Sequence, residues 1–213
     1  MGKRFLAAGL ACLVTLAAWT AVSMPAAQDI VFTAVRAGDP LGRHRVEIRT
    51  DGDVTRVKTE IDFHVSLAFL TVYRLRHTSR EVWRDGLLVS LDSQTNDNGQ
   101  EHAVQARATR RGLVVEGPAG RSVVPAETMT TGSYWHPGVI AAERLIDTRT
   151  GRILEVTARR VATERIRAGG RTVEADRYRI DGDIKLNLWY AGQDWVKLSF
   201  RARGSDVDYV REP

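Results

Sequence analysis

The stretch Val57-Lys58-Thr59-Glu60-Ile61-Asp62-Phe63-His64-Val65 sets the pattern on which the fold prediction rests. Apolar side chains or threonine occupy its odd positions, while charged side chains and one histidine occupy its even positions. A period of two residues is typical of a β-strand with one buried face and one face in water. The stretch therefore predicts a half-buried strand of an antiparallel sheet.

The same alternation recurs along the chain, and tight-turn signals separate the runs. Near the C-terminus, Ile184, Leu186, Leu188 and Tyr190 alternate with polar residues or tryptophan, and Val196, Leu198 and Phe200 repeat the pattern. Roughly ten to thirteen such runs follow one another at the spacing typical of sandwiches and barrels. Dipeptides that tolerate positive φ lie between runs, namely Asp51-Gly52, Asp85-Gly86, Asn98-Gly99, Gly169-Gly170 and Gly182-Asp183.

These runs predict an all-β fold: a single curved antiparallel meander sheet, half-barrel or barrel-like, with a loop or short helix covering one side. The covering element is expected between Pro125 and Ile146, where the strand rhythm fails. One interpretation makes this stretch a lid over a ligand. The other, which we favour, makes it an ordinary crossover whose Trp135 packs into the sheet.

The N-terminus has the order of a secretory signal. Lys3 and Arg4 precede an uncharged apolar run that ends near Met24, and small residues suited to signal peptidase follow. We expect a signal peptide over residues 1–27, cleaved between 23 and 27, and a single antiparallel β domain over 28–213. Periplasmic or secreted localisation follows, and the alternative is an uncleaved N-terminal helix anchored in the inner membrane.

Composition narrows the function classes. The leader holds two basic residues and no acidic one, so its removal lowers the net charge from +5 to +3. The arginines are spread along the strands, which favours solvated faces over a nucleic-acid surface. Cys12 is the only cysteine and lies in the leader, so the mature chain would hold no disulfide and no thiol nucleophile.

Catalytic and metal-binding motifs are absent from the sequence, and we predict no catalytic residue, no metal and no cofactor. The five histidines occur singly, and lone histidines on wet strand faces are the favoured interpretation. A hydrolase assembled from Asp97 or Asp92 with His102 and Ser133 is the least favoured alternative. Aromatic residues that can contact an apolar ligand are the candidate binding residues, namely Trp83, Tyr134, Trp135 and Trp189.

A set of short motifs in a fixed order resembles a family of exported bacterial proteins catalogued only as a domain of unknown function. The resemblance covers nearly the whole mature chain and implies no activity. One departure is Arg203, where an acidic residue is expected before Gly204. The fold also resembles, more loosely, the half-barrels of periplasmic lipoprotein and lipid carriers. The motifs are Leu41-Gly42-Arg43-His44, Glu81-x-Trp83-x-Asp85-Gly86-Leu87, Ser93-x-Thr95-Asn96-Asp97-Asn98-Gly99, Ser133-x-Trp135, Asp147-Thr148-x-Thr150-Gly151, Leu188-Trp189-Tyr190 and Gly204-Ser205-x-Val207-x-Tyr209.

Two function hypotheses precede the hydrolase. The first is a non-catalytic envelope carrier or binding module that holds an apolar or amphipathic small molecule in the concave face of the sheet. The second is an envelope scaffold or accessory protein that acts through a protein partner. Neither expects nucleic acid as a partner or a stable membrane span after signal cleavage.

Overall fold

The fold is known from a computed structural model, which describes residues 26–67, 70–202 and 204–213. The expected signal peptide therefore lies outside the described residues, apart from Ala26 and Ala27, which begin the first strand. No helix in the described part of the chain is both long and apolar enough to cross a membrane.

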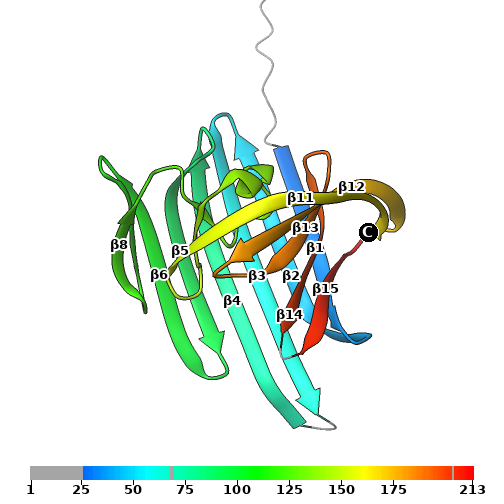
Figure 1. The fold of residues 1–213 in the computed structure, drawn as a ribbon. Coiled ribbons are helices and arrows are strands. Elements are labelled where there is room, and N and C mark those ends of the chain that lie inside the picture. The colour runs from blue at the N-terminus through cyan, green and yellow to red at the C-terminus, as the bar shows by residue number, and fades with distance from the viewer. Residues whose placement is uncertain (1–25, 68–69, 203) are drawn as a thin grey trace, which may run out of the picture.

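One curved sheet of fifteen strands makes up the fold of the described residues, so the predicted all-β, barrel-like class is confirmed (Figure 1). Its first eight strands are β1 (Ala26–Arg36), β2 (Asp39–Asp51), β3 (Val54–Leu67), β4 (Leu70–Arg84), β5 (Leu87–Asp97), β6 (Gln100–Thr109), β7 (Gly112–Gly117) and β8 (Gly120–Val124). The others are β9 (Met129–Thr130), β10 (Arg144–Ile146), β11 (Ile153–Ala168), β12 (Arg171–Gly182), β13 (Leu186–Ala191), β14 (Asp194–Ala202) and β15 (Ser205–Arg211).

The strand order is a meander that folds back on itself. It runs from β8 down to β1, then from β15 down to β9. Antiparallel pairing of β1 with β15 joins the first and last described strands, as in the register Ala34 to Tyr209. Because β8 and β9 do not pair, the sheet remains open, and the parallel pair β9 and β10 makes it mixed.

Alternation decides which side chains enter the interior. In β3, Val57, Thr59 and Phe63 are buried, while Asp62 and His64 are exposed, as the pattern predicts. Antiparallel register then aligns buried residues of neighbouring strands into rows across the concave face. One such row contains Ile48, Val57, Glu81, Leu91 and Ala106.

A second, smaller apolar cluster lies on the opposite face of the sheet. It contains Ala168, Ala175, Trp189 and Val196. The prediction that Val196 shares a face with Leu198 is wrong, because a β-bulge shifts the register between β13 and β14 at this point. The bulge turns Val196 outward and leaves Trp195 and Leu198 in the main core.

Glycines permit two features of the fold. The turn Asn98-Gly99 has positive φ at both residues, 53° and 94°, as a tight hairpin requires. Gly42 allows β2 and β3 to approach closely, because a Cβ there would lie 1.9 Å from the carbonyl oxygen of Asp62. Gly42 follows Leu41, which the register leaves without a Cα partner at a β-bulge between β1 and β2.

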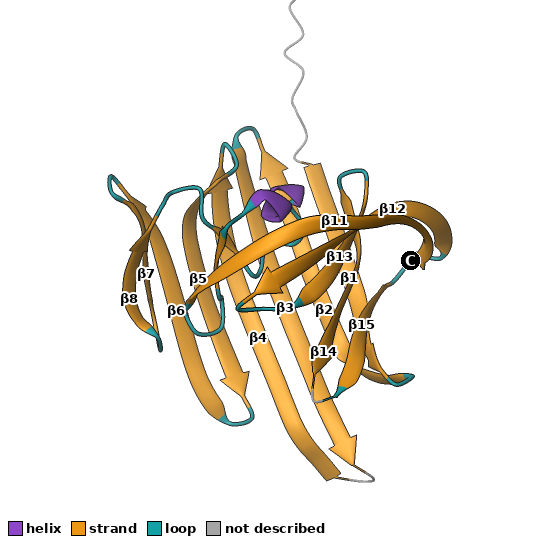
Figure 2. Cartoon of the chain, in the orientation of Figure 1, coloured by secondary structure: helices purple, strands orange, loops and turns teal. Residues whose placement is uncertain are grey.

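The stretch expected to break the strand rhythm packs against the concave face. We call residues 125–152 the inner segment. It contains the 3-10 helix η1 (Pro137–Ala141) between the short strands β9 and β10, and Figure 2 shows this helix in front of the upper part of the sheet. Tyr134, Val139, Leu145 and Ile146 join the main core. The expected loop with a short helix is confirmed.

Candidate functional site

The four candidate binding residues do not lie together. Trp83 and Tyr134 are buried in the main core, and Trp135 is half-buried beside them. The rings of Trp83 and Trp135 meet edge to face, with their centroids 6.0 Å apart. Trp189 belongs to the outer cluster, on the opposite face of the sheet. Ligand binding by these residues stays a prediction.

Trp189 is fixed by polar and cationic neighbours. Its Nε1 donates a 2.9 Å hydrogen bond to Oε2 of Glu164, and the Lys197 ammonium lies 4.9 Å from its ring centroid. A ring held between a carboxylate and a cation fastens the β11–β12 hairpin onto β13 and β14. These contacts give Trp189 a structural role.

A buried carboxyl group joins the sheet to the inner segment. Glu81 is 1% exposed and accepts a hydrogen bond from Nε1 of Trp83 at 2.8 Å and from Oγ1 of Thr130 at 2.7 Å. Burial raises its pKa above the ordinary value of 4.5, although both hydrogen bonds act in the opposite direction. A Cβ on Gly132 would lie only 2.8 Å from Oε1 of Glu81, so the loop fits closely over the carboxyl group.

Hydroxyl and imidazole groups extend this polar contact along the inner segment. Oγ of Ser93 donates to the carbonyl oxygen of Thr148 at 2.6 Å. Nδ1 of His77 lies 2.8 Å from Oγ1 of Thr95, and its Nε2 lies 3.4 Å from Oγ1 of Thr148. We call the set Glu81, Trp83, His77, Ser93, Thr95, Thr130 and Thr148 the polar seam. It fixes the position of the inner segment on β4 and β5.

The polar seam is built largely from residues that carry the sequence resemblance. Glu81, Trp83, Ser93, Thr95 and Thr148 all belong to the motifs quoted above. Sequence reasoning missed the polar seam because its partners are far apart in the chain. Thr130 and Glu81, for example, are 49 positions apart. One signal was available in the sequence, because alternate residues of a strand share a face. This rule places Glu81 with Trp83 on one face of β4, and Ser93 with Thr95 on one face of β5.

The prediction that the histidines lie on solvent-exposed strand faces is wrong for two of them. His64 is exposed, but His44 and His77 are only 4% and 3% exposed. Burial lowers the pKa of His44 to about 3 and that of His77 to about 4, so both rings are neutral at physiological pH. Neither ring nitrogen of His44 has a hydrogen-bond partner. The same holds for the hydroxyl groups of Thr59 and Ser79, which lie opposite each other on β3 and β4.

The hypothetical hydrolase residues do not assemble. Oγ of Ser133 donates to the carbonyl oxygen of Thr130 and accepts from its backbone nitrogen, so this hydroxyl is used within its own turn. The structure gives no hydrogen bond between Ser133 and His102 in its described residues. Within the same residues, no three or more His, Cys, Asp or Glu side chains gather as a metal site would require.

Clefts at the surface of the described residues include the following two. One, of about 260 Å³, lies between η1 and the β11–β12 hairpin and includes Tyr178, Glu174 and Asp176. The carboxylate of Asp176 is already paired with Arg160. The other, of about 410 Å³, is called the end cleft and lies where the β1–β2 turn, the end of β3 and the start of β15 meet. It is lined by Arg36, Ala37, Asp39, Pro40, Leu41, His64, Val65 and Ser205.

The end cleft continues the apolar interior. Leu41 lines it and also packs against the main core, and its position at the β1–β2 bulge turns it toward this end. Val65 follows Phe63 on the same face of β3, because alternate residues of a strand share a face. A volume of about 410 Å³ falls in the range of small-molecule sites.

An open, curved sheet with a segment packed in its concave face defines a barrel-like β domain. The family model of DUF6134, a domain of unknown function, matches residues 32–212, and the chain belongs to that family. The expected resemblance to a family of unknown function is thereby confirmed. No curated protein matches the chain.

A solved structure shares the fold. It is a beta-barrel-like protein of domain of unknown function DUF1849 from Brucella abortus. The match has a TM-score of 0.62 and 8% sequence identity, and it covers 87% of this chain and 95% of that one. At this identity the similarity establishes the fold alone.

Proposed function

We propose that this domain is a non-catalytic carrier or binding module of the bacterial envelope, with an apolar or amphipathic small molecule as its ligand. The observation that carries the proposal is the end cleft, where the apolar interior reaches the surface in a space of about 410 Å³. The envelope location follows from the expected signal peptide and from the resemblance to exported proteins.

The binding place differs from the one expected from sequence. Tyr134, Val139, Leu145 and Ile146 of the inner segment occupy the middle of the concave face, and the polar seam holds them there. At the end cleft, by contrast, Leu41 and Val65 reach the surface as lining residues. The ligand therefore binds at the end of the sheet, and the inner segment acts as a structural filling of the barrel.

Calorimetric titration with decanol and decanoate tests the proposal. We expect both to bind the mature protein, and we expect Leu41→Gln to weaken both because it places an amide among the apolar groups of the cleft. Val123→Gln is the control, because Val123 is 56% exposed on β8 and does not line the cleft. If neither decanol nor decanoate bound, the proposal would be refuted.

The alternative is an envelope scaffold that acts through a protein partner, and one observation favours it. Strand β8 pairs only with β7, so its other edge has no strand partner in the described structure. An open edge can accept an added strand from another protein. If Val123→Lys abolished co-purification of an envelope protein while neither decanol nor decanoate bound the wild-type protein, the scaffold would replace the carrier.

A further inference from the structure

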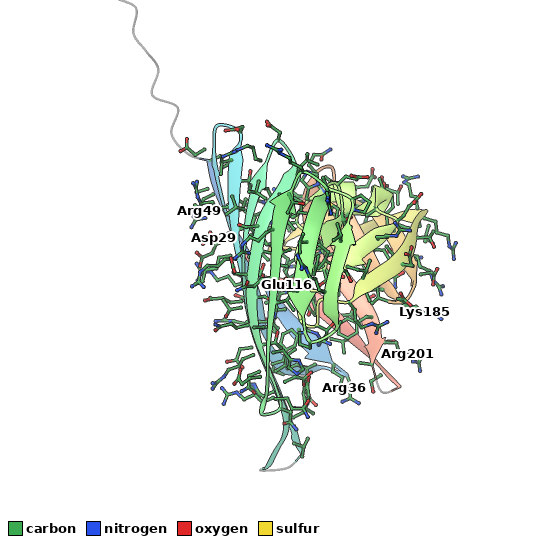
Figure 3. The ribbon with its side chains drawn as sticks, turned by 90° about the vertical axis from the view of Figure 1, so that its left-hand side faces the viewer. Asp29, Arg36, Arg49, Glu116, Lys185 and Arg201 are labelled. Carbon is green, nitrogen blue, oxygen red and sulfur yellow. The ribbon has the colours of Figure 1, made fainter. Side chains whose placement is uncertain are left out.

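Arg36 is a cation placed beside the apolar part of the end cleft. It lies at the end of β1, is half-buried, and donates from Nη2 to Oγ of Ser205 at 3.2 Å. Figure 3 shows it at the lower end of the molecule, far from Asp29 and Arg49. These two residues form a 2.7 Å ion pair.

No carboxylate neutralises Arg36 within the described part of the chain. The ion pairs found there engage many arginines, including Arg43, Arg45 and Arg107, but not Arg36. Asp39 lies opposite Arg36 in the β1–β2 register and also lines the cleft, yet it is exposed and forms no ion pair with the guanidinium in the described structure. A half-buried guanidinium without a carboxylate is well suited to an anionic ligand group.

The apolar and cationic parts are close enough to serve one molecule. Arg36 and Leu41 belong to the same β1–β2 hairpin, and Val65 faces them from β3 within the same cleft. Pro40 adds a further apolar surface at the turn. A molecule that lies in this cleft therefore meets carbon groups along its length and a planar cation at one side.

We propose that the end cleft selects single-chain amphiphiles with an anionic head group, such as a medium-chain carboxylate. The carboxylate accepts hydrogen bonds from the Arg36 guanidinium, and the alkyl chain lies against Leu41 and Val65. This inference rests on the proposed function and adds the charge of the ligand to it. A cationic head group is disfavoured because it would face the Arg36 guanidinium.

Three ligands of equal chain length test the inference in calorimetric titrations: decanoate, decanol and decylammonium, at a pH where the acid and the amine are both charged. We expect decanoate to bind about tenfold more tightly than decanol, the gain that one charge-assisted hydrogen bond provides. Decylammonium should bind most weakly. Arg36→Gln should reduce decanoate to the affinity of decanol and leave decanol unchanged.

Matched variants separate charge recognition from loss of structure. Arg56→Gln removes the same charge from an exposed site at the other end of β3 and should leave the decanoate preference intact. Arg36→Lys keeps the charge and should retain part of the preference. Equal affinities of the wild-type protein for all three ligands would overturn the inference and leave the proposed function standing. If none of the three bound, the proposed function itself would fail.

Discussion

The indole nitrogen of Trp83 donates a 2.8 Å hydrogen bond to Oε2 of Glu81, two positions earlier on the same strand. Thr130 of the inner segment donates to the other carboxyl oxygen. A charged residue type thus lies in a row of apolar side chains, at a point where a segment from elsewhere in the chain meets the sheet. The contact makes Glu81 the attachment point of the inner segment.

Glu81→Ala tests this attachment. The change leaves the Trp83 N–H and the Thr130 O–H without an acceptor in a buried place, and each such donor costs about 1–3 kcal/mol. We expect a loss of roughly 3 kcal/mol in the free energy of unfolding by urea denaturation. Glu116→Ala is the control, because Glu116 forms an exposed ion pair with Arg121 and should cost less than about 1 kcal/mol. Similar losses in both variants would contradict the assigned role.

The raised pKa of Glu81 predicts a pH dependence. A folded-state pKa above the unfolded value means that the stabilising contribution is complete below the unfolded pKa and is lost as pH rises through the folded pKa. Glu81→Gln removes the ionisation and keeps one carbonyl acceptor for Trp83. The variant should therefore gain stability relative to the wild type as pH rises above the ordinary range of glutamate. Parallel stability curves in urea titrations would show that Glu81 does not titrate there.

Trp135→Ala distinguishes a structural residue from a lid over the ligand. Trp135 is half-buried and packs edge to face on Trp83, so we expect a loss of about 2 kcal/mol, below the range for a fully buried tryptophan. It lies next to η1 and does not line the end cleft, which is formed by the β1–β2 turn, the end of β3 and the start of β15. Decanoate affinity should therefore stay unchanged. A selective loss of binding with little loss of stability would restore the lid.

Trp189→Ala should release the β11–β12 hairpin from the outer face of the sheet. Removal of a buried indole with its bond to Glu164 and its contact with Lys197 should cost roughly 3 kcal/mol. Hydrogen exchange should rise most in residues 162–175, which form the end of that hairpin. Val161→Ala, at an exposed position of β11, is the control. Unchanged exchange in the hairpin would contradict this role.

Sequence alternation predicted the fold class because burial on one face imposes a period of two on each strand. It identified the inward side chains of β3 for that reason, whereas the turn at Asn98-Gly99 was identified from residues that tolerate positive φ. It did not reveal that Val196 turns outward, because a bulge inserts one residue without a change in residue type. The polar seam was also hidden, since its contact between His77 and Thr148 joins residues 71 positions apart.

His44 gives the most direct pH prediction. Its ring lies in the main core among Phe32, Trp195 and Tyr209, with centroids 6.5, 5.6 and 5.5 Å away. Neither ring nitrogen has a hydrogen-bond partner. Burial lowers its pKa from 6.5 to about 3, with a smaller effect of His77 in the same direction. The fold keeps this ring neutral, whereas the unfolded chain protonates it once the pH falls below 6.5. Folding is therefore opposed by this residue at acidic pH.

The sign follows from that difference. A folded-state pKa below the unfolded value means that the stability contribution is complete above pH 6.5 and is lost as pH falls toward about 3. His44→Leu removes the titrating group. Because the His44 ring makes no hydrogen bond, its replacement by another buried side chain should change stability by less than about 1 kcal/mol at neutral pH. Below pH 6.5, the variant should gain about 1.4 kcal/mol over the wild type for each pH unit. His64→Leu, at an exposed position, should follow the wild type throughout. Urea denaturation at a series of pH values measures all three proteins, and a constant gap between His44→Leu and the wild type would show that His44 is not buried in its neutral form.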